Sequence, residues 1–229
     1  MGGMDFADII RSLTIYVIPI ILAVTLHEAA HAYAAKWLGD DTAHRLGRTT
    51  LNPIGHIDPI GTVVMPLGLW ILSGGMFLFG YAKPVPVIEQ RLRNPRADMP
   101  IVALAGPAAN AVMALGWAIL FVISARFFAD QEFFRLVSEA GIKANILFFA
   151  FNMLPILPLD GGRILKGMLP KSLAEGFARS EPYGFFIVLA LAFAGGGLLY
   201  QYWINPVSSL LGNLIKLIIS PLLTVFGLR

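Results

Sequence analysis

Apolar residues in this chain are grouped into six long runs that alternate with polar segments. A helix that crosses a bilayer needs about 20 predominantly apolar residues, and the runs approach or exceed that length. The pattern therefore predicts an all-α polytopic membrane protein with about five to six transmembrane helices. The runs cover approximately residues 9–38, 61–80, 99–128, 141–159, 183–203 and 206–226.

The chain shows no internal repeat and no appended soluble segment, so residues 1–229 are interpreted as a single membrane-embedded domain. We expect its core at about 9–170, followed by a C-terminal helix pair at about 183–226. Residues 83–88 differ from the runs because they combine two prolines with three β-branched residues. This combination predicts an extended edge segment instead of a helix.

The amino-acid composition also indicates a membrane environment. Hydrophobic residues make up 57% of the chain and charged residues 14%, whereas soluble domains average about 45–50% apolar and about 25% charged. The net charge of +3 does not indicate nucleic-acid binding, because the basic residues are spread between the apolar runs, as topology signals are. The lipid bilayer is the expected partner. The chain has no cysteine, so any transition-metal site must use histidine and carboxylate.

The first apolar run contains an H-E-x-x-H motif formed by His27, Glu28 and His31. Helix residues four apart project from nearly the same face, so the two imidazoles can bind one Zn²⁺ while Glu28 borders it as a general base. The alternative is a pair of histidines that make ordinary hydrogen bonds. Ionisable groups at membrane depth are costly and usually functional, which favours the metal site.

A third ligand is required, and no other histidine falls in an apolar run. Asp160 ends the fourth run and offers a carboxylate, which suits zinc beside two imidazoles. Its alternative role is to cap the next helix. His44 and His56 lie in the polar segment 39–60; His56 is kept as a minor candidate for a fourth or inhibitory ligand.

Together these motifs resemble the site-2 protease family of intramembrane zinc metalloproteases, in the small branch without a PDZ or CBS domain. The resemblance covers about residues 15–170, and the stretch 79–87 is similar to that branch. The family's N-x-x-P-x-x-P-x-D-G segment is matched by Asn152, Pro155, Pro158, Asp160 and Gly161, and its G-P-x-x-N by Gly106, Pro107 and Asn110.

The resemblance implies one zinc ion held by His27, His31 and Asp160, with Glu28 as general base. It implies an endopeptidase that cuts single-span transmembrane proteins within their apolar segment. By the same resemblance Asn110 and Asn152 are candidates for binding substrate backbone, although interhelical hydrogen bonding is an equal alternative. Val85 and Val87, in the edge segment, are candidates for pairing with an unwound substrate as an added strand; a plain linker is the alternative.

The need for His27 and Asp160 to bind the same zinc ion also predicts the membrane topology of the chain. His27 and Asp160 can share one ion only if their helices run in the same direction, so only one of the two intervening runs can span. The run 61–80 is interrupted by Pro66 and Gly74-Gly75, and we expect it to be a re-entrant or β-hairpin-like segment. Lys and Arg then divide 12 to 4 between the two sides, with Lys216 left out. The larger number marks the cytoplasm, which places the zinc site and the C-terminus of this cell-membrane protein towards that side.

Two other functions remain open on the sequence. One is a membrane zinc hydrolase that acts on a peptide outside the bilayer, and the other is a non-proteolytic membrane scaffold. Glu28 argues against the scaffold, because a structural metal site has no need of a base. The substrate's identity and the oligomeric state do not follow from the residues.

Overall fold

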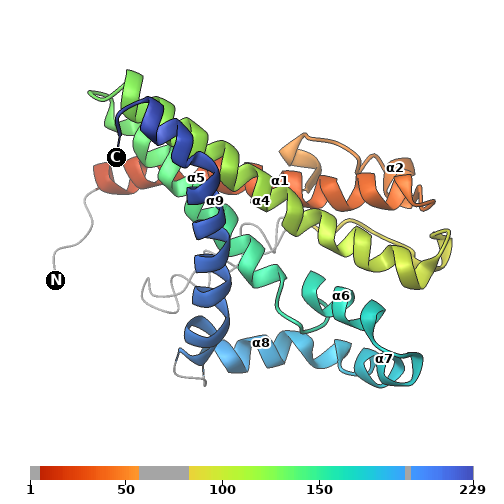
Figure 1. Cartoon of the computed structure of the whole chain (residues 1–229). Helices are drawn as coiled ribbons and strands as arrows, with labels where there is room; N and C mark the ends of the chain where they lie inside the picture. The colour runs from red at the N-terminus through yellow and green to blue at the C-terminus, as the bar shows by residue number, and fades with distance from the viewer. Residues whose placement is uncertain (1–5, 57–82, 194–196, 229) are drawn as a thin grey trace.

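The computed structural model describes residues 6–56, 83–193 and 197–228 (Figure 1). Its centre is formed by three long helices: α1 (Phe6–Trp37), α4 (Pro95–Phe127) and α5 (Glu132–Asn152). Each packs against the other two. Figure 1 shows α1 and α5 running in the same direction, with α4 antiparallel to both. The fourth apolar run thus begins as a helix parallel to α1, although Asp160 lies beyond the end of that helix.

Shorter elements surround this centre. Helices α6 and α7 lie at the end of the bundle where α1 finishes, and α9 crosses α4 and α5 on the other side of the molecule (Figure 1). Their bounds are α2 (Thr42–Arg45), η1 (Pro53–His56), η3 (Glu89–Arg91), α6 (Asp160–Met168), α7 (Lys171–Ala178), η4 (Glu181–Tyr183), α8 (Gly184–Phe193), η5 (Tyr200–Ile204) and α9 (Asn205–Val225).

Small residues let the central helices approach closely. Seven of the buried positions of α1 and α4 are alanines, and many large apolar side chains on the same helices are exposed. This distribution suits packing in lipid, where association depends on close van der Waals contact and not on a hydrophobic core. The alanines concerned are Ala23, Ala29, Ala32, Ala35, Ala103, Ala114 and Ala118.

Three helical stretches among the described residues are long and apolar enough to cross a membrane: Leu13–Trp37, Pro95–Phe127 and Tyr200–Val225. Five to six were expected. Helix α5 is long enough, but it carries four charged residues in its first twelve positions and packs against both α1 and α4. The predicted re-entrant run 61–80 lies outside the described residues and remains a prediction.

The fourth apolar run does not form one helix up to Asp160. Helix α5 ends at Asn152, the residues to Leu159 are turns, and Asp160 begins α6. Prolines 155 and 158 explain the interruption, because proline lacks the N–H that a continuing helix needs.

The C-terminal placement expected from the sequence is corrected by the structure. Helix α8 is described over ten residues, Gly184–Phe193, or about 15 Å. After α7, Tyr200–Val225 is the one described stretch that is long and apolar enough to span a bilayer. The ring of Phe226 packs on Phe127 at the far end of α4, with centroids 5.6 Å apart. The C-terminal end therefore lies opposite the loops with which it was expected to share a side.

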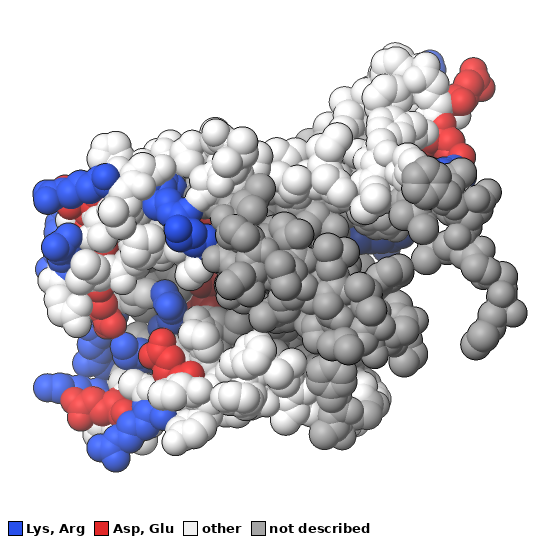
Figure 2. Space-filling model, turned by 180° about the vertical axis from the view of Figure 1, so that it is seen from behind, with Lys and Arg blue, Asp and Glu red and all other residues white. Residues whose placement is uncertain are grey.

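Charged side chains gather at one end of the molecule, with a smaller group at the opposite end (Figure 2). At the first end, Arg93 donates to the carbonyl of Trp37 at 2.7 Å and Arg96 to that of Leu169 at 2.6 Å. At the other end, Arg11 pairs with Glu132 at 2.8 Å, which joins the starts of α1 and α5. This is the distribution expected of a bundle that spans a bilayer.

Single-cysteine variants test this arrangement, since the natural chain has no cysteine. A membrane-impermeant thiol reagent should label Leu46→Cys and Met168→Cys from one face of sealed vesicles, and Asp130→Cys and Leu228→Cys from the other. Labelling of Leu228→Cys together with Leu46→Cys would contradict the C-terminal placement described above.

Candidate metal centre

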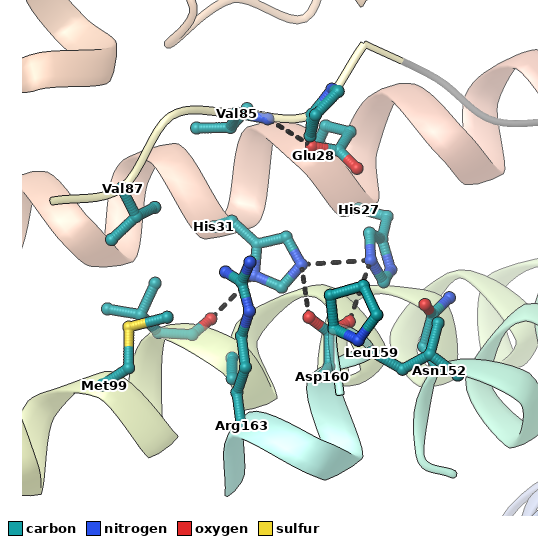
Figure 3. A pocket seen from close by; sticks show the side chains of 14 residues that line it. His27, Glu28, His31, Val85, Val87, Met99, Asn152, Leu159, Asp160 and Arg163 are labelled. Carbon is teal, nitrogen blue, oxygen red and sulfur yellow. Dashed lines mark hydrogen bonds and ion pairs between the residues drawn. The ribbon is translucent and has the colours of Figure 1, made fainter. Parts of the chain in front are cut away.

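Two histidines of α1 and one aspartate of α6 converge inside the bundle (Figure 3). The Nε2 atoms of His27 and His31 lie 3.1 Å apart. Asp160 places Oδ2 3.2 Å from Nε2 of His27 and Oδ1 3.4 Å from Nε2 of His31. All three residues are buried. Asp160 begins α6 but its side chain caps nothing, because the N-cap position belongs to Leu159.

The second nitrogen of each imidazole is held by α4. Nδ1 of His27 lies 2.6 Å from Oδ1 of Asn110, and Nδ1 of His31 lies 2.8 Å from the backbone oxygen of Val102. Oxygen atoms of this kind only accept hydrogen bonds, so each Nδ1 carries the proton and each Nε2 presents a lone pair. The contact between the two Nε2 atoms is then not a hydrogen bond. Two lone pairs and a carboxylate face one another, and a cation is needed to hold them together.

The spacing fits a metal ion. Bonds of about 2.0–2.1 Å in tetrahedral geometry separate ligand atoms by roughly 3.3 Å, which matches the observed separations of 3.1–3.4 Å. Oδ2 of Asp160 is buried with no hydrogen-bond partner among the described residues. Two imidazoles and one carboxylate, with the imidazoles held through Nδ1, are the donor set of many catalytic zinc sites.

Asn110 occupies the position behind His27 and not the cavity in front of it. Its side chain is fully buried, and its amide nitrogen donates to the carbonyl of Ala23 at 3.2 Å and to Oδ1 of Asn145 at 3.0 Å. Asn145 in turn donates to the carbonyl of Gly141 at 2.9 Å. The network joins α1, α4 and α5 and fixes the ring of His27. The geometry thus shows interhelical hydrogen bonding at Asn110.

Three glycines provide the space that this centre needs. A Cβ atom at Gly106 would collide with both imidazoles, so α4 can lie against the histidine pair only with glycine at that position. A Cβ atom at Gly161 would meet the backbone of Met153 and Leu154, and one at Gly162 that of Ile156 and Leu157. The glycine pair lets the first turn of α6 pack on the preceding turns, which brings Asp160 to the histidines.

A cavity of about 150 Å³ opens beside the three residues and is lined by Glu28, Asn152, Val85 and Val87, among others. Oε2 of Glu28 accepts a hydrogen bond of 2.9 Å from the backbone N–H of Val85. Asn152 donates to the carbonyl of Phe148 at 3.0 Å. Apart from the buried Asn110, and from His56, whose side chain lies outside the described residues, the site residues predicted from the sequence border this cavity.

Asp40 holds the segment 83–88 through a second hydrogen bond, and this residue was not predicted from the sequence. The backbone N–H of Ile88 donates to Oδ2 of Asp40 at 2.6 Å, and Thr42 donates to the other oxygen. Burial tends to raise the pKa of Asp40, but the hydrogen bonds from Thr42 and Ile88, with the charge of Arg91, outweigh it and lower the pKa. In sequence, Gly39-Asp40-Asp41 is typical of an ordinary turn, and no signal there distinguishes Asp40.

His44 does not join the described metal centre. Nδ1 of His44 lies 2.7 Å from Oγ1 of Thr49 in an exposed position. The side chain of His56 lies outside the described residues, so its proposed role as a ligand remains a prediction. Arg163 also lines the cavity. Its spacing of three from Asp160 was a usable signal, because helix residues three apart share a face.

Comparison with known proteins gives the centre its context. The chain is 38% identical over 184 residues to the Bacillus subtilis protein named "Putative zinc metalloprotease YwhC", which covers 76% of this chain and 78% of the relative. It is 30% identical over 193 residues to "Putative zinc metalloprotease Rip2" of Mycolicibacterium smegmatis, covering 81% of this chain and 71% of that one. The chain belongs to the site-2 protease family of zinc metalloproteases.

A more distant member, "Zinc metalloprotease MJ0392" of Methanocaldococcus jannaschii, is 24% identical over 152 residues, or 66% of this chain and 33% of its own. No family model matches the chain. No solved structure matches it. The names of these family members support a zinc metalloprotease role and agree with a His–His–Asp group that can bind the metal.

The hydrogen bond between Asn110 and His27 predicts a specific effect on metal affinity. Asn110→Ala leaves Nδ1 of His27 buried without an acceptor and frees the ring, so zinc affinity should fall about 10–100-fold. Competition with a chromogenic chelator measures this. Asn152→Ala is the matched control, because that amide does not contact either histidine, and its affinity should equal that of the natural protein. Equal affinity for both variants would exclude the orienting role.

Proposed function

We propose that this chain is an intramembrane zinc endopeptidase that cleaves transmembrane segments of single-span membrane proteins. The observation that carries the proposal is the placement of the His–His–Asp group and Glu28 within a bundle of helices apolar enough to span a bilayer. In this proposal His27, His31 and Asp160 hold the zinc ion. Residues 1–229 act as one domain embedded in the cell membrane.

The remaining chemistry is assigned to Glu28. Bound zinc supplies a Lewis acid that polarises the scissile carbonyl and makes water more acidic. One oxygen of Glu28 is held by the N–H of Val85, and the other has no partner among the residues described. This free oxygen can accept a proton from the attacking water and deliver it to the leaving nitrogen. The hydrogen bond from Val85 keeps the carboxylate turned towards the cavity.

We assign the binding of the substrate backbone to the edge segment 83–88 and to Asn152. A helical substrate must unwind before cleavage, and its exposed N–H and C=O groups then need partners. Among the described residues of segment 83–88, the N–H of Val85 is used by Glu28 and that of Ile88 by Asp40, whereas the N–H of Val87 makes no bond. Val87 is therefore the free donor for an added strand.

The sidedness is proposed from charge. His27 and His31 lie in the second half of α1, towards the end of the bundle that carries α2, α6 and α7. Most of the basic side chains gather at that end (Figure 2), and the side with more Lys and Arg is normally cytoplasmic. The catalytic group then lies towards the cytoplasm, and the C-terminal end of α9 lies on the opposite face.

Expression of the natural protein and of Glu28→Gln beside a panel of single-span membrane proteins tests the proposed activity. Glu28→Gln keeps the shape of the side chain but removes the base, so cleavage should fall at least about 100-fold while zinc content stays at one ion per chain. Product mass locates the cut. Cleavage only outside the apolar segment would favour the membrane zinc hydrolase of non-transmembrane peptides, and equal products with both proteins would exclude Glu28 as the base.

Metal analysis of Asp160→Asn belongs to the same experiment. The amide lacks the charge that offsets the metal's, so zinc content after dialysis should fall well below that of the natural protein. Undiminished zinc would remove Asp160 from the site.

Substitution of Val87 by proline tests strand addition. Val87→Pro removes the free N–H of Val87 without touching the donor to Glu28, so cleavage should fall about tenfold with zinc content unchanged, for the loss of a buried hydrogen bond. Val87→Ala is the control, since it shortens the same side chain and keeps the N–H. Val85→Pro is unsuitable because it also releases Glu28. If Val87→Pro cleaves as well as Val87→Ala, strand addition at this residue is excluded.

A further inference from the structure

Arg163 is the one cationic side chain, among those described, that lines the catalytic cavity. It lies on α6 three residues after Asp160, and Figure 3 shows its side chain extending from that helix into the cavity near His31. The side chain is half-buried. Because Arg163 lies beside the proposed reacting groups, the anion that it binds is expected to take part in the reaction.

The guanidinium of Arg163 has no hydrogen bond or ion pair with any described residue. In contrast, Lys166, about one turn further along α6, forms an ion pair with Glu89 at 2.9 Å. The two carboxylates of the cavity are engaged elsewhere, Glu28 with Val85 and Asp160 with the histidines. A half-buried charge with five unused N–H donors is costly unless a ligand of opposite charge offsets it.

The chemistry of that ligand follows from the shape of the guanidinium. Its planar fork matches a carboxylate in bidentate fashion, and much of the remaining cavity wall near it is apolar, with Val87, Met99 and Val102. Peptide hydrolysis itself forms a carboxylate: the C–N bond breaks, the oxygen of water joins the carbonyl carbon, and the nitrogen leaves as a protonated amine. The reaction thus produces, beside the metal centre, the anion that Arg163 lacks.

We propose that Arg163 is the carboxylate-binding residue of the cavity and recognises the new C-terminus of the N-terminal cleavage product. The proposal rests on the proposed function for the origin of that carboxylate. An Asp or Glu side chain of the substrate offers the same chemistry and is the alternative source. In either case Arg163 selects the charged group and not the apolar residues around it.

Peptide binding tests the proposal without turnover. The probe is N-acetyl-Ala-Leu-Val-Ala-Leu-Ala with a free C-terminal carboxylate, compared with the same peptide as a C-terminal amide, each titrated calorimetrically into Glu28→Gln protein. Because zinc also attracts carboxylates, the titrations use both the zinc-loaded and the chelator-stripped protein. The stripped protein should prefer the acid over the amide by about 10–100-fold, as expected for a charge-assisted hydrogen bond.

Three further variants in the Glu28→Gln background decide the result. Arg163→Gln should bring the acid and amide affinities of the stripped protein within about twofold of each other, and Arg163→Lys should retain part of the preference. Lys166→Gln is the matched control on the same helix and should keep the full preference. An acid preference in the stripped Arg163→Gln protein that equals that of its parent would overturn the proposal.

A second series of peptides distinguishes the two possible sources of the carboxylate, the product C-terminus and a substrate side chain. Glutamate replaces each of the last three residues of the amide peptide in turn. If one of these restores tight binding that depends on Arg163, while the free acid does not bind better than the amide, the substrate side chain is the ligand and recognition of the product is excluded. Loss of zinc or of cleavage in the natural protein would instead contradict the proposed function and leave this comparison unaffected.

Discussion

The two imidazoles of α1 can present their Nε2 atoms to Asp160 only because α4 holds their Nδ1 atoms. Asn110 and the carbonyl of Val102 accept those two hydrogen bonds, and each fixes one ring and one tautomer. The requirement reaches beyond the site, because α4 must pass directly against the histidine face of α1. Gly106 permits that approach, and Asn110, one helical turn later, closes the contact and continues it into α5 through Asn145.

The residues of the centre were predictable because each follows from a local rule. His27, Glu28 and His31 share a helix face by their spacing, and a buried carboxylate was needed to complete the metal site. The predictions that were wrong concern where the helices end and how they are connected. Hydropathy counts apolar residues but does not show where a helix ends, so the run before Asp160 was predicted to be one helix, although prolines 155 and 158 stop α5 at Asn152. The same limit led to a wrong C-terminal placement.

Glu28 shows why a motif does not define the whole site. Its spacing in H-E-x-x-H assigns it to proton transfer, but the structure adds a tether, since it also accepts the N–H of Val85. Asp40 repeats the arrangement at Ile88 with a buried carboxylate whose pKa is lowered. Two acidic side chains thus hold the edge segment over the cavity. Such contacts between side chain and backbone leave no pattern in sequence, because any residue except proline can supply the N–H.

Charge balance in the cavity connects these observations. In the proposed site Glu28 and Asp160 carry negative charge, and a divalent cation held by the histidines and Asp160 would offset both charges without help from Arg163. In that site the guanidinium would be an excess positive charge, which agrees with the lack of a carboxylate partner for Arg163 among the described residues. Hydrolysis changes the balance by adding one anion at the scissile carbon. A site built with one uncompensated cation is neutral when it holds the carboxylate product, and this makes release of that fragment, as well as bond cleavage, a step that Arg163 can control.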